Sequence, residues 1–313
     1  MNNKNFIKEQ LIKSGIKKGD TLLVRAALRS INMREKSDFL EGLLEVLGSE
    51  GTLMGLSFSD SYLFPFISKG TFTKESSTNS GGFSNAMLSH PKSHRSLHPT
   101  NSYVAIGKNA EYILGEHNEN SKCYTPISKL LELNGKMLLV GCIDSSPGFT
   151  TVHYAQEVLG LTEKSFLKNL KGIQYKDGDI KKNFFRKDYG GCSKGFNKFY
   201  SLYMNEGLLE QFKVGDASSL IIDANKAYEL ELKTLKMRPH YLLCNDPLCL
   251  SCRTTWKNNI KDILNPYFTT KKKGTGLGLS IVNKIINDHN GELKFHPITD
   301  GAKIEINFLS NGN

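Results

Sequence analysis

Two short segments of the chain hold the residue types that could carry acid–base chemistry. Residues 95–102 read Arg-Ser-Leu-His-Pro-Thr-Asn-Ser, and residues 150–157 read Thr-Thr-Val-His-Tyr-Ala-Gln-Glu. Each segment places one histidine, His98 or His153, among hydroxyls and small side chains. Imidazole exchanges a proton near neutral pH, and neighbouring hydroxyls can contact a ligand. This composition is typical of a group-transfer site.

Alternating helices and strands are expected to position these segments. Apolar spacing predicts helices over 5–14, 37–47, 83–88, 128–133, 151–159 and 224–237, and strands over 21–24, 51–56, 102–106, 136–140 and 219–222. The alternation predicts an α/β fold, a three-layer sheet with helices on both faces. Ligands of such sheets bind beyond strand ends and near helix starts, where both histidine segments fall. Residues 60–82 and 164–198 are expected to be irregular, the first of them lining a pocket.

The charge of the chain narrows the classes of ligand. The 313 residues carry a net charge of +10, but the lysines are scattered, and only residues 271–273 form an unbroken run. A diffuse excess argues against nucleic acid and favours small phosphate-bearing ligands over polycations. No apolar run approaches the roughly 20 residues of a bilayer span, and the first residues lack a secretory pattern. We expect a cytoplasmic protein that binds neither nucleic acid nor membrane.

Three cysteines near the middle of the C-terminal third have a spacing that metal ligands can show. Cys244, Cys249 and Cys252 form a C-x4-C-x2-C pattern, as in some zinc and iron–sulfur sites. The fourth ligand is missing nearby, although Cys192 or His240 would complete a tetrahedral site. Reduced, buried thiols are the competing interpretation. On balance the sequence predicts no metal.

Several ordered motifs together resemble one enzyme family. Residues 19–24, 28–30, 51–54, 95–107 and 150–157 are similar, in the same order and spacing, to the aminoglycoside 3-N-acetyltransferase family. The similarity runs over about residues 5–253, which we take as one domain, 1–253. The resemblance implies an antibiotic-resistance type of acyltransferase that moves the acetyl group of acetyl-coenzyme A to an amine. Its acceptor would be an aminoglycoside or a nucleotide-linked amino sugar.

The resemblance also implies roles for particular residues. An ammonium group must lose a proton before it attacks a thioester, so His153 or His98 would act as general base. Gln156 and Asp188 would orient the imidazole, although an aspartate before two glycines is also typical of a turn. Thr150 and Thr151, at a helix start, would stabilise the oxyanion. The positions assigned to coenzyme A are Arg25, Ala27, Leu28, Arg29, Ser30, Arg95, Ser96, Thr150 and Thr151.

The chain departs from the family pattern at two positions. Arg25 stands where family members commonly carry a histidine, and an arginine pairs with phosphate rather than acting as a base. Gln156 stands where a glutamate is usual, and an amide orients an imidazole without stabilising its charged form. The basic net charge favours an amino sugar that carries an anion over a polycation. An inactive homologue that only binds coenzyme or sugar is therefore an alternative.

The end of the chain resembles a different protein class. Residues 265–282 are similar to the last glycine-rich box of sensor histidine kinases, with a helix expected over 279–289 and strands over 292–295 and 303–308. The asparagine-bearing helix and the Asp-x-Gly-x-Gly segment of those kinases are missing. We therefore expect residues 254–313 to be a small, incomplete α+β appendage. A signalling protein with an ATP-binding module is the alternative function.

Overall fold

The computed structural model describes most of the chain, which divides into two compact units. The described residues are 3–33, 35, 37–161, 170–186, 192–246, 248–249, 252, 275, 277–296 and 303–308. The first unit is Met1–Leu243 and the second is Cys244–Asn313. The division falls earlier than the predicted boundary after residue 253.

A seven-stranded mixed sheet forms the centre of the first unit, in the order β10-β11-β7-β1-β2-β6-β5. Strand β1 runs parallel to both of its neighbours, β2 and β7, and the other pairs are antiparallel. The carboxyl ends of β1, β2 and β7 therefore meet at one edge, where ligands of α/β sheets bind. The strand bounds are β1 Thr21–Ala26, β2 Thr52–Leu56, β5 His94–Arg95, β6 Tyr103–Gly107, β7 Lys136–Val140, β10 Leu209–Val214 and β11 Ala217–Asp223.

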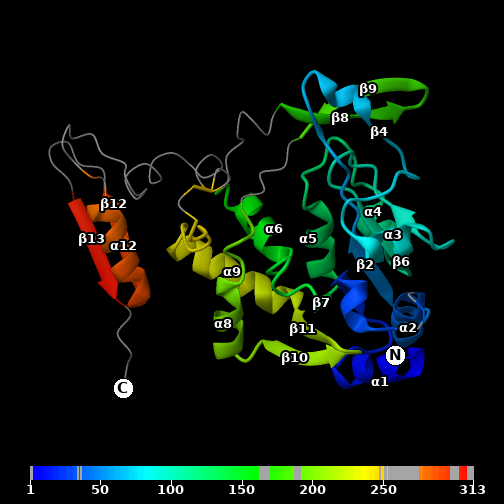
Figure 1. Ribbon diagram of the computed structural model, residues 1–313, viewed down its shortest axis with the longest axis horizontal. Helices are drawn as coiled ribbons and strands as arrows, with labels where there is room; N and C mark the ends of the chain where they lie inside the picture. The colour runs from blue at the N-terminus through cyan, green and yellow to red at the C-terminus, as the bar shows by residue number, and fades with distance from the viewer. Residues whose placement is uncertain are drawn as a thin grey trace. The chain divides into compact units, whose positions relative to one another are not determined.

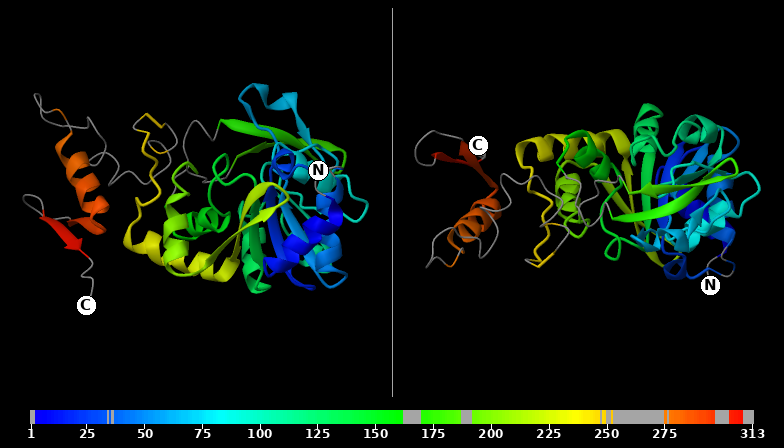
Figure 2. Two further views of the ribbon diagram at one scale, coloured as in Figure 1. Left: turned by 60° about the horizontal axis from the view of Figure 1, so that its bottom comes forward. Right: turned by 90° about the horizontal axis from the view of Figure 1, so that it is seen from above.

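Helices cover both faces of this sheet (Figures 1 and 2). One face buries alternate strand residues, such as Leu22 and Val24 of β1, against α1 (Lys4–Lys13), α2 (Ser37–Leu47) and α3 (Gly82–Leu88). The other face is covered by α4 (Ala110–Leu114), α5 (Thr125–Glu132) and α9 (Ala224–Met237), on which α6 (Thr151–Val158) and α8 (Lys198–Asn205) pack. Because successive side chains of a strand point to opposite faces, apolar residues of the sheet pack against the helices on both sides. The predicted α/β class is confirmed.

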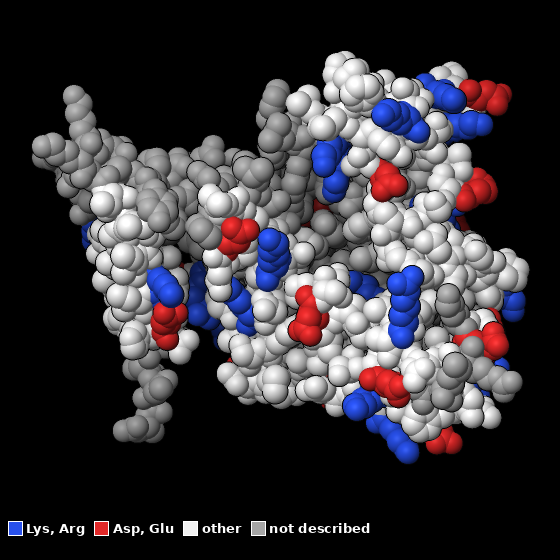
Figure 3. All heavy atoms as spheres, in the orientation of Figure 1, with Lys and Arg blue, Asp and Glu red and all other residues white. Residues whose placement is uncertain are grey.

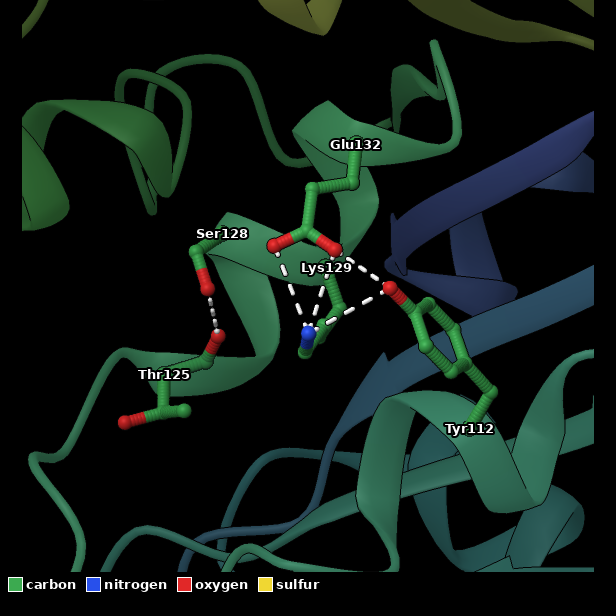
Figure 4. Close-up of polar contacts among 5 residues, drawn as sticks. All are labelled: Tyr112, Thr125, Ser128, Lys129 and Glu132. Carbon is green, nitrogen blue, oxygen red and sulfur yellow. Dashed lines mark hydrogen bonds and ion pairs between the residues drawn. The ribbon is translucent and has the colours of Figure 1, made fainter.

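Helix α5 is tied to α4 by a polar cluster on the surface. The ammonium of Lys129 lies 3.1 Å from Glu132 Oε2 and 3.3 Å from the hydroxyl of Tyr112, which donates to the same carboxylate (Figure 4). Ser128 Oγ donates to the carbonyl of Thr125 in the first turn of α5. These exposed contacts contribute little stability each, and burial of Ile127 and Leu130 holds α5 in place. Its preceding residue, Tyr124, reaches the site described below.

A second, smaller sheet combines the two segments expected to be irregular. Strand β8 (Lys171–Asp177) pairs with β3 (Tyr62–Leu63), β4 (Thr71–Phe72) and β9 (Ile180–Phe185), at the top in Figure 1. The 3₁₀ turn Phe66–Lys69 lies between β3 and β4, and another, Leu28–Ile31, follows β1. The prediction of an irregular 164–198 region is wrong for the β8–β9 hairpin. Its strands are mostly exposed and rich in lysine, so no apolar run marks them.

The second unit contains a helix and a hairpin among its described residues. Helix α12 (Gly278–Asp288) precedes β12 (Gly291–His296) and β13 (Lys303–Phe308), which pair antiparallel from Gly291↔Phe308 onward. The helix and strands expected here are confirmed. Most of the glycine-rich box, residues 265–274 and 276, lies outside the described residues. In the described ranges of both units, every helix is too short or too polar for a membrane span.

Candidate active site

A cavity of about 860 Å³ opens where β1, β2 and β7 end. Part of its lining comes from residues 25–29, at and after the end of β1, and from residues at the ends of β2 and β7. Its walls come from the start of α6 and from the insertion that contains residues 79–82. Its lining residues include Arg25, Ala27, Leu28, Arg29, Leu56, Phe58, Ser80, Gly81, Tyr124, Cys142, Ser146, Phe149, Thr150, His153, Ser193 and Phe196. The insertion therefore lines the pocket, as the sequence predicts.

His153 enters this cavity from the first turn of α6. Its ring stacks on Tyr124, with centroids 5.2 Å apart, and meets the edge of Phe196 at 4.6 Å. Its Nδ1 lies 3.2 Å from Oε1 of Gln156, three residues later on the same helix face. The amide oxygen accepts the hydrogen of Nδ1, which leaves Nε2 as the basic nitrogen. The contact is the one that the predicted orienting role of Gln156 requires.

Gln156 itself is almost completely buried, at 1% exposure. Burial keeps water from competing for Oε1, while the amide Nε2 has no hydrogen-bond partner among the described residues. The neighbouring Glu157 points elsewhere: its carboxyl interacts with the backbone of Cys123 and Tyr124, and burial raises its pKa to about 7. The separation of the two side chains follows from the roughly 100° between successive helix residues.

Arg25 lies at the end of β1 and lines the cavity. Its guanidinium donates to the carbonyl oxygens of Gly148 and Ser146, both at 2.7 Å, and to the Ser146 hydroxyl. Burial lowers the pKa of this guanidinium. Arg25 therefore holds the loop that leads into α6, and its predicted pairing with a phosphate stays a prediction.

The two threonines at the start of α6 have different surroundings. Thr150, the N-cap residue, lines the cavity and makes no capping hydrogen bond through its side chain. Thr151 is fully buried, and its hydroxyl donates to Glu231 Oε1 at 2.7 Å. The hydroxyl of Tyr203 donates to the same oxygen, and burial raises the pKa of Glu231 to about 8. The hydroxyl of Thr151 is therefore already paired, and contact of this residue with a ligand stays a prediction.

The His98 segment is mostly buried and lies outside the cavity lining. His98 is fully buried, and it does not line the cavity. Its Nδ1 accepts a hydrogen bond from the backbone of Asn101 at 3.0 Å, and its ring stacks on His117 and meets the edge of Phe184. A general base must reach the proton that it removes. The cavity lining does not include His98, and its role as a base stays a prediction.

Arg95 and Ser96, which were assigned to coenzyme A, belong to the same buried segment. Arg95 donates to the carbonyl of Ser57 at 2.9 Å and to the hydroxyl of Ser102 at 3.1 Å. Ser96 Oγ accepts from the backbone of Tyr103 at 2.9 Å. Neither residue lines this cavity; both line a second one, of about 470 Å³, and their assignment to coenzyme A stays a prediction. Buried polar groups need such partners, and here they hold β5 and β6 together.

The remaining predicted positions divide between the cavity and its surroundings. Ala27, Leu28 and Arg29 line it. Ser30 does not, and its hydroxyl donates to the carbonyl of Ala27 at 2.7 Å. Asp188 lies outside the described residues. The side chains that sequence reasoning missed are the aromatic neighbours of His153 and the buried Glu231.

Positive charge dominates the cavity lining. Arg25 and Arg29 line it, and the described lining residues include no aspartate or glutamate. Elsewhere the charges are mixed: on the face drawn in Figure 3, basic and acidic side chains are interspersed. Two arginines without a described lining carboxylate give the lining a net positive charge, which attracts anionic ligands.

A short similarity exists to a protein of another class. The nitrogen regulation protein NtrY of Azorhizobium caulinodans is 48% identical over 52 residues, which cover 16% of this chain and 7% of that protein. The kinase-like nature of residues 254–313 stays a prediction.

Comparison with known proteins identifies the family to which the larger part of the chain belongs. Aminoglycoside N(3)-acetyltransferase IX of Micromonospora chalcea is 24% identical over 271 residues, which cover 74% of this chain and 92% of that protein. The fold matches the aminoglycoside acetyltransferase AAC(3)-IVa, with a TM-score of 0.65 and 22% identity over 80% of this chain and 95% of that one. It also matches AAC-IIIb in binary complex with CoASH, with a TM-score of 0.62 and 20% identity over 76% and 97%. The family model for aminoglycoside 3-N-acetyltransferase matches residues 23–236. The chain therefore belongs to the aminoglycoside 3-N-acetyltransferase family, enzymes that move the acetyl group of acetyl-coenzyme A to an aminoglycoside amine.

Proposed function

We propose that His153 is the general base of acetyl transfer in this chain. The observation that carries the proposal is the hydrogen bond of its Nδ1 to Gln156 Oε1 inside the cavity. That bond fixes the tautomer, so Nε2 offers its lone pair to an acceptor amine. Stacking against Tyr124 holds the plane of the ring. His153 thus supplies the base, and Gln156 and Tyr124 hold its ring in place.

The reaction that this arrangement serves has a simple balance. Nε2 takes a proton from the acceptor ammonium, and the amine nitrogen attacks the carbonyl carbon of acetyl-coenzyme A. A C–N bond forms and the C–S bond breaks. The departing sulfur takes the second proton of the attacking nitrogen, so the coenzyme leaves as the thiol and the product is a neutral amide. The carbonyl oxygen gains negative charge during attack, and the hydroxyl of Thr150, which lines the cavity at the start of α6, is the donor for it. Arg29, exposed at the cavity, is the cation for a coenzyme phosphate.

The test follows release of the coenzyme thiol from acetyl-coenzyme A, with an aminoglycoside panel as acceptors. His153→Ala should lower kcat by about 100-fold or more, the usual contribution of a positioned base. His94→Ala is the matched control, because His94 is exposed and does not line this cavity. A His153→Ala protein that turns over at the rate of the control would refute the assignment.

The lining charge favours a second acceptor class, an amino sugar that carries a nucleotide or another anion. Arg25 and Arg29 attract phosphate, and no described lining carboxylate is available to bind a polycation. The same thiol assay, run with a nucleotide-linked amino sugar, should give a higher kcat/KM than with a classical aminoglycoside. The opposite order would assign the acceptor to the aminoglycosides alone.

A further inference from the structure

Three cysteines of the second unit bring their sulfur atoms together. The Sγ atoms of Cys244 and Cys252 are 3.6 Å apart, and those of Cys244, Cys249 and Cys252 all lie within 4.8 Å of one another. None of the chain's six cysteines, all of which lie in the described ranges, takes part in a disulfide. Cys252 is buried, while Cys244 and Cys249 are half-buried. The cluster is therefore reachable from solvent.

The sulfur spacing fits a shared metal ion. A disulfide would bring the two sulfurs to about 2.05 Å. In a tetrahedral site with metal–sulfur bonds of about 2.3 Å, neighbouring thiolates are separated by about 3.8 Å. The observed 3.6 Å between Cys244 and Cys252 is close to that edge length. The cysteines are thus arranged as ligands of one ion.

Backbone hydrogen bonds prepare the loop for this arrangement. The N–H of Cys249 donates to the carbonyl of Asp246 at 3.1 Å, and the N–H of Leu248 donates to the Asp246 carboxylate at 3.0 Å. This turn carries Cys249 back toward Cys244. The N–H of Cys244 points at Cys252 Sγ, 3.5 Å away. Amide donors of this kind stabilise a thiolate and tune a bound metal.

We propose that Cys244, Cys249 and Cys252 bind Zn²⁺ as thiolates. Soft sulfur ligands in tetrahedral geometry select zinc, and the three thiol protons leave to solvent as the ion enters. Water completes the fourth position. The ion would fix the loop that follows the acetyltransferase unit. This reverses the sequence prediction of thiols without metal.

The test uses the full chain, purified under reducing conditions. Metal analysis should find zinc at one equivalent per chain. Titration of the stripped protein with Co²⁺ should give the absorption of a tetrahedral cobalt–thiolate site. The variant Cys244→Ser/Cys249→Ser/Cys252→Ser should lose both, while Cys142→Ser, a thiol of the other unit, should keep both. A wild-type protein that binds neither zinc nor cobalt would overturn the proposal, and so would a triple variant that retains zinc.

A second measurement does not depend on folding of the variants. Thiols of the unmodified protein are counted with a chromogenic disulfide before and after a strong chelator removes the metal. Three additional thiols should react after chelation, because thiolates bound to zinc are protected. An unchanged count would contradict the proposal.

Discussion

Replacing Gln156 with glutamate changes one atom next to the imidazole of His153 and tests its orientation directly. The new carboxylate would accept the Nδ1 hydrogen at the site where the amide oxygen now lies 3.2 Å away. A carboxylate stabilises the imidazolium, which the amide cannot do. The imidazolium then holds its proton more tightly, so a higher pH is needed to remove it. The acidic limb of the pH–rate profile should therefore move to higher pH.

The expected size follows from the same distance. Two unit charges 3.2 Å apart attract by about 5 kcal/mol at an effective dielectric constant of 20, and by about 1 kcal/mol in water. Because the position is buried, desolvation of the carboxylate opposes part of this gain. At about 1.4 kcal/mol for each tenfold change in proton affinity, the limb should move by about 1 to 3 pH units.

The assay is kcat/KM from thiol release between pH 5 and 9 for the wild type and Gln156→Glu. Gln211→Glu is the matched control, since Gln211 is exposed on β10 and the chemical change is the same. The control should leave the limb where it is in the wild type. If Gln156→Glu also leaves it there, His153 is not the group whose protonation limits the rate.

Three further results are expected. Burial raises the pKa of Glu231 from 4.5 to about 8, so its unfolded form ionises first, and urea denaturation should find stability falling by up to about 5 kcal/mol between pH 4.5 and 8. Glu231→Gln should remove that part of the pH dependence, and an unchanged slope would refute the assignment. Gly141→Ala should destabilise by about 2–4 kcal/mol, because φ is +63° and the new Cβ would lie 1.7 Å from Ser30 Oγ. Gly178→Ala, at φ +59° with open space, should cost only about 1 kcal/mol in the same denaturation, and equal losses would contradict the steric argument. Arg25→Met should weaken coenzyme A binding by about 10- to 100-fold in calorimetry, because two charge-assisted bonds to the loop are lost, whereas unaltered affinity would mean that the loop needs no anchor.

Local patterns predicted much of the fold because their causes are local. Strand β7 and helix α9 begin and end where apolar spacing places them. The β8–β9 hairpin was missed because its stability comes from pairing with β3 and β4, which are distant in sequence. That miss explains another, since Phe184 of β9 packs against His98 and helps to bury it. Without the hairpin, His98 and His153 look equivalent.

In the candidate site, too, contacts within one helix could be predicted from the sequence, and contacts between distant segments could not. The pairing of His153 with Gln156 follows from helix periodicity, because residues three apart share a face. Tyr124 and Phe196 come from other elements, and nothing near them in sequence indicates that they flank an imidazole. Glu231 could have been found from the sequence. It is a charged residue on the buried face of α9, together with Ala227 and Thr234, and a buried carboxyl group requires a hydrogen-bond partner.

The peptide of Gly148 is held from both sides by side chains far away in the chain. Its carbonyl accepts from Arg25 on β1, and its N–H donates to the hydroxyl of Tyr200 on α8 at 2.7 Å. The approach to α6 is thus completed only after segments 123 and 52 residues away have docked. Closing such long loops is slow, so catalytic competence should appear late during refolding. Protection of the Gly148 amide from hydrogen exchange during refolding would show when Tyr200 docks and this part of the site forms.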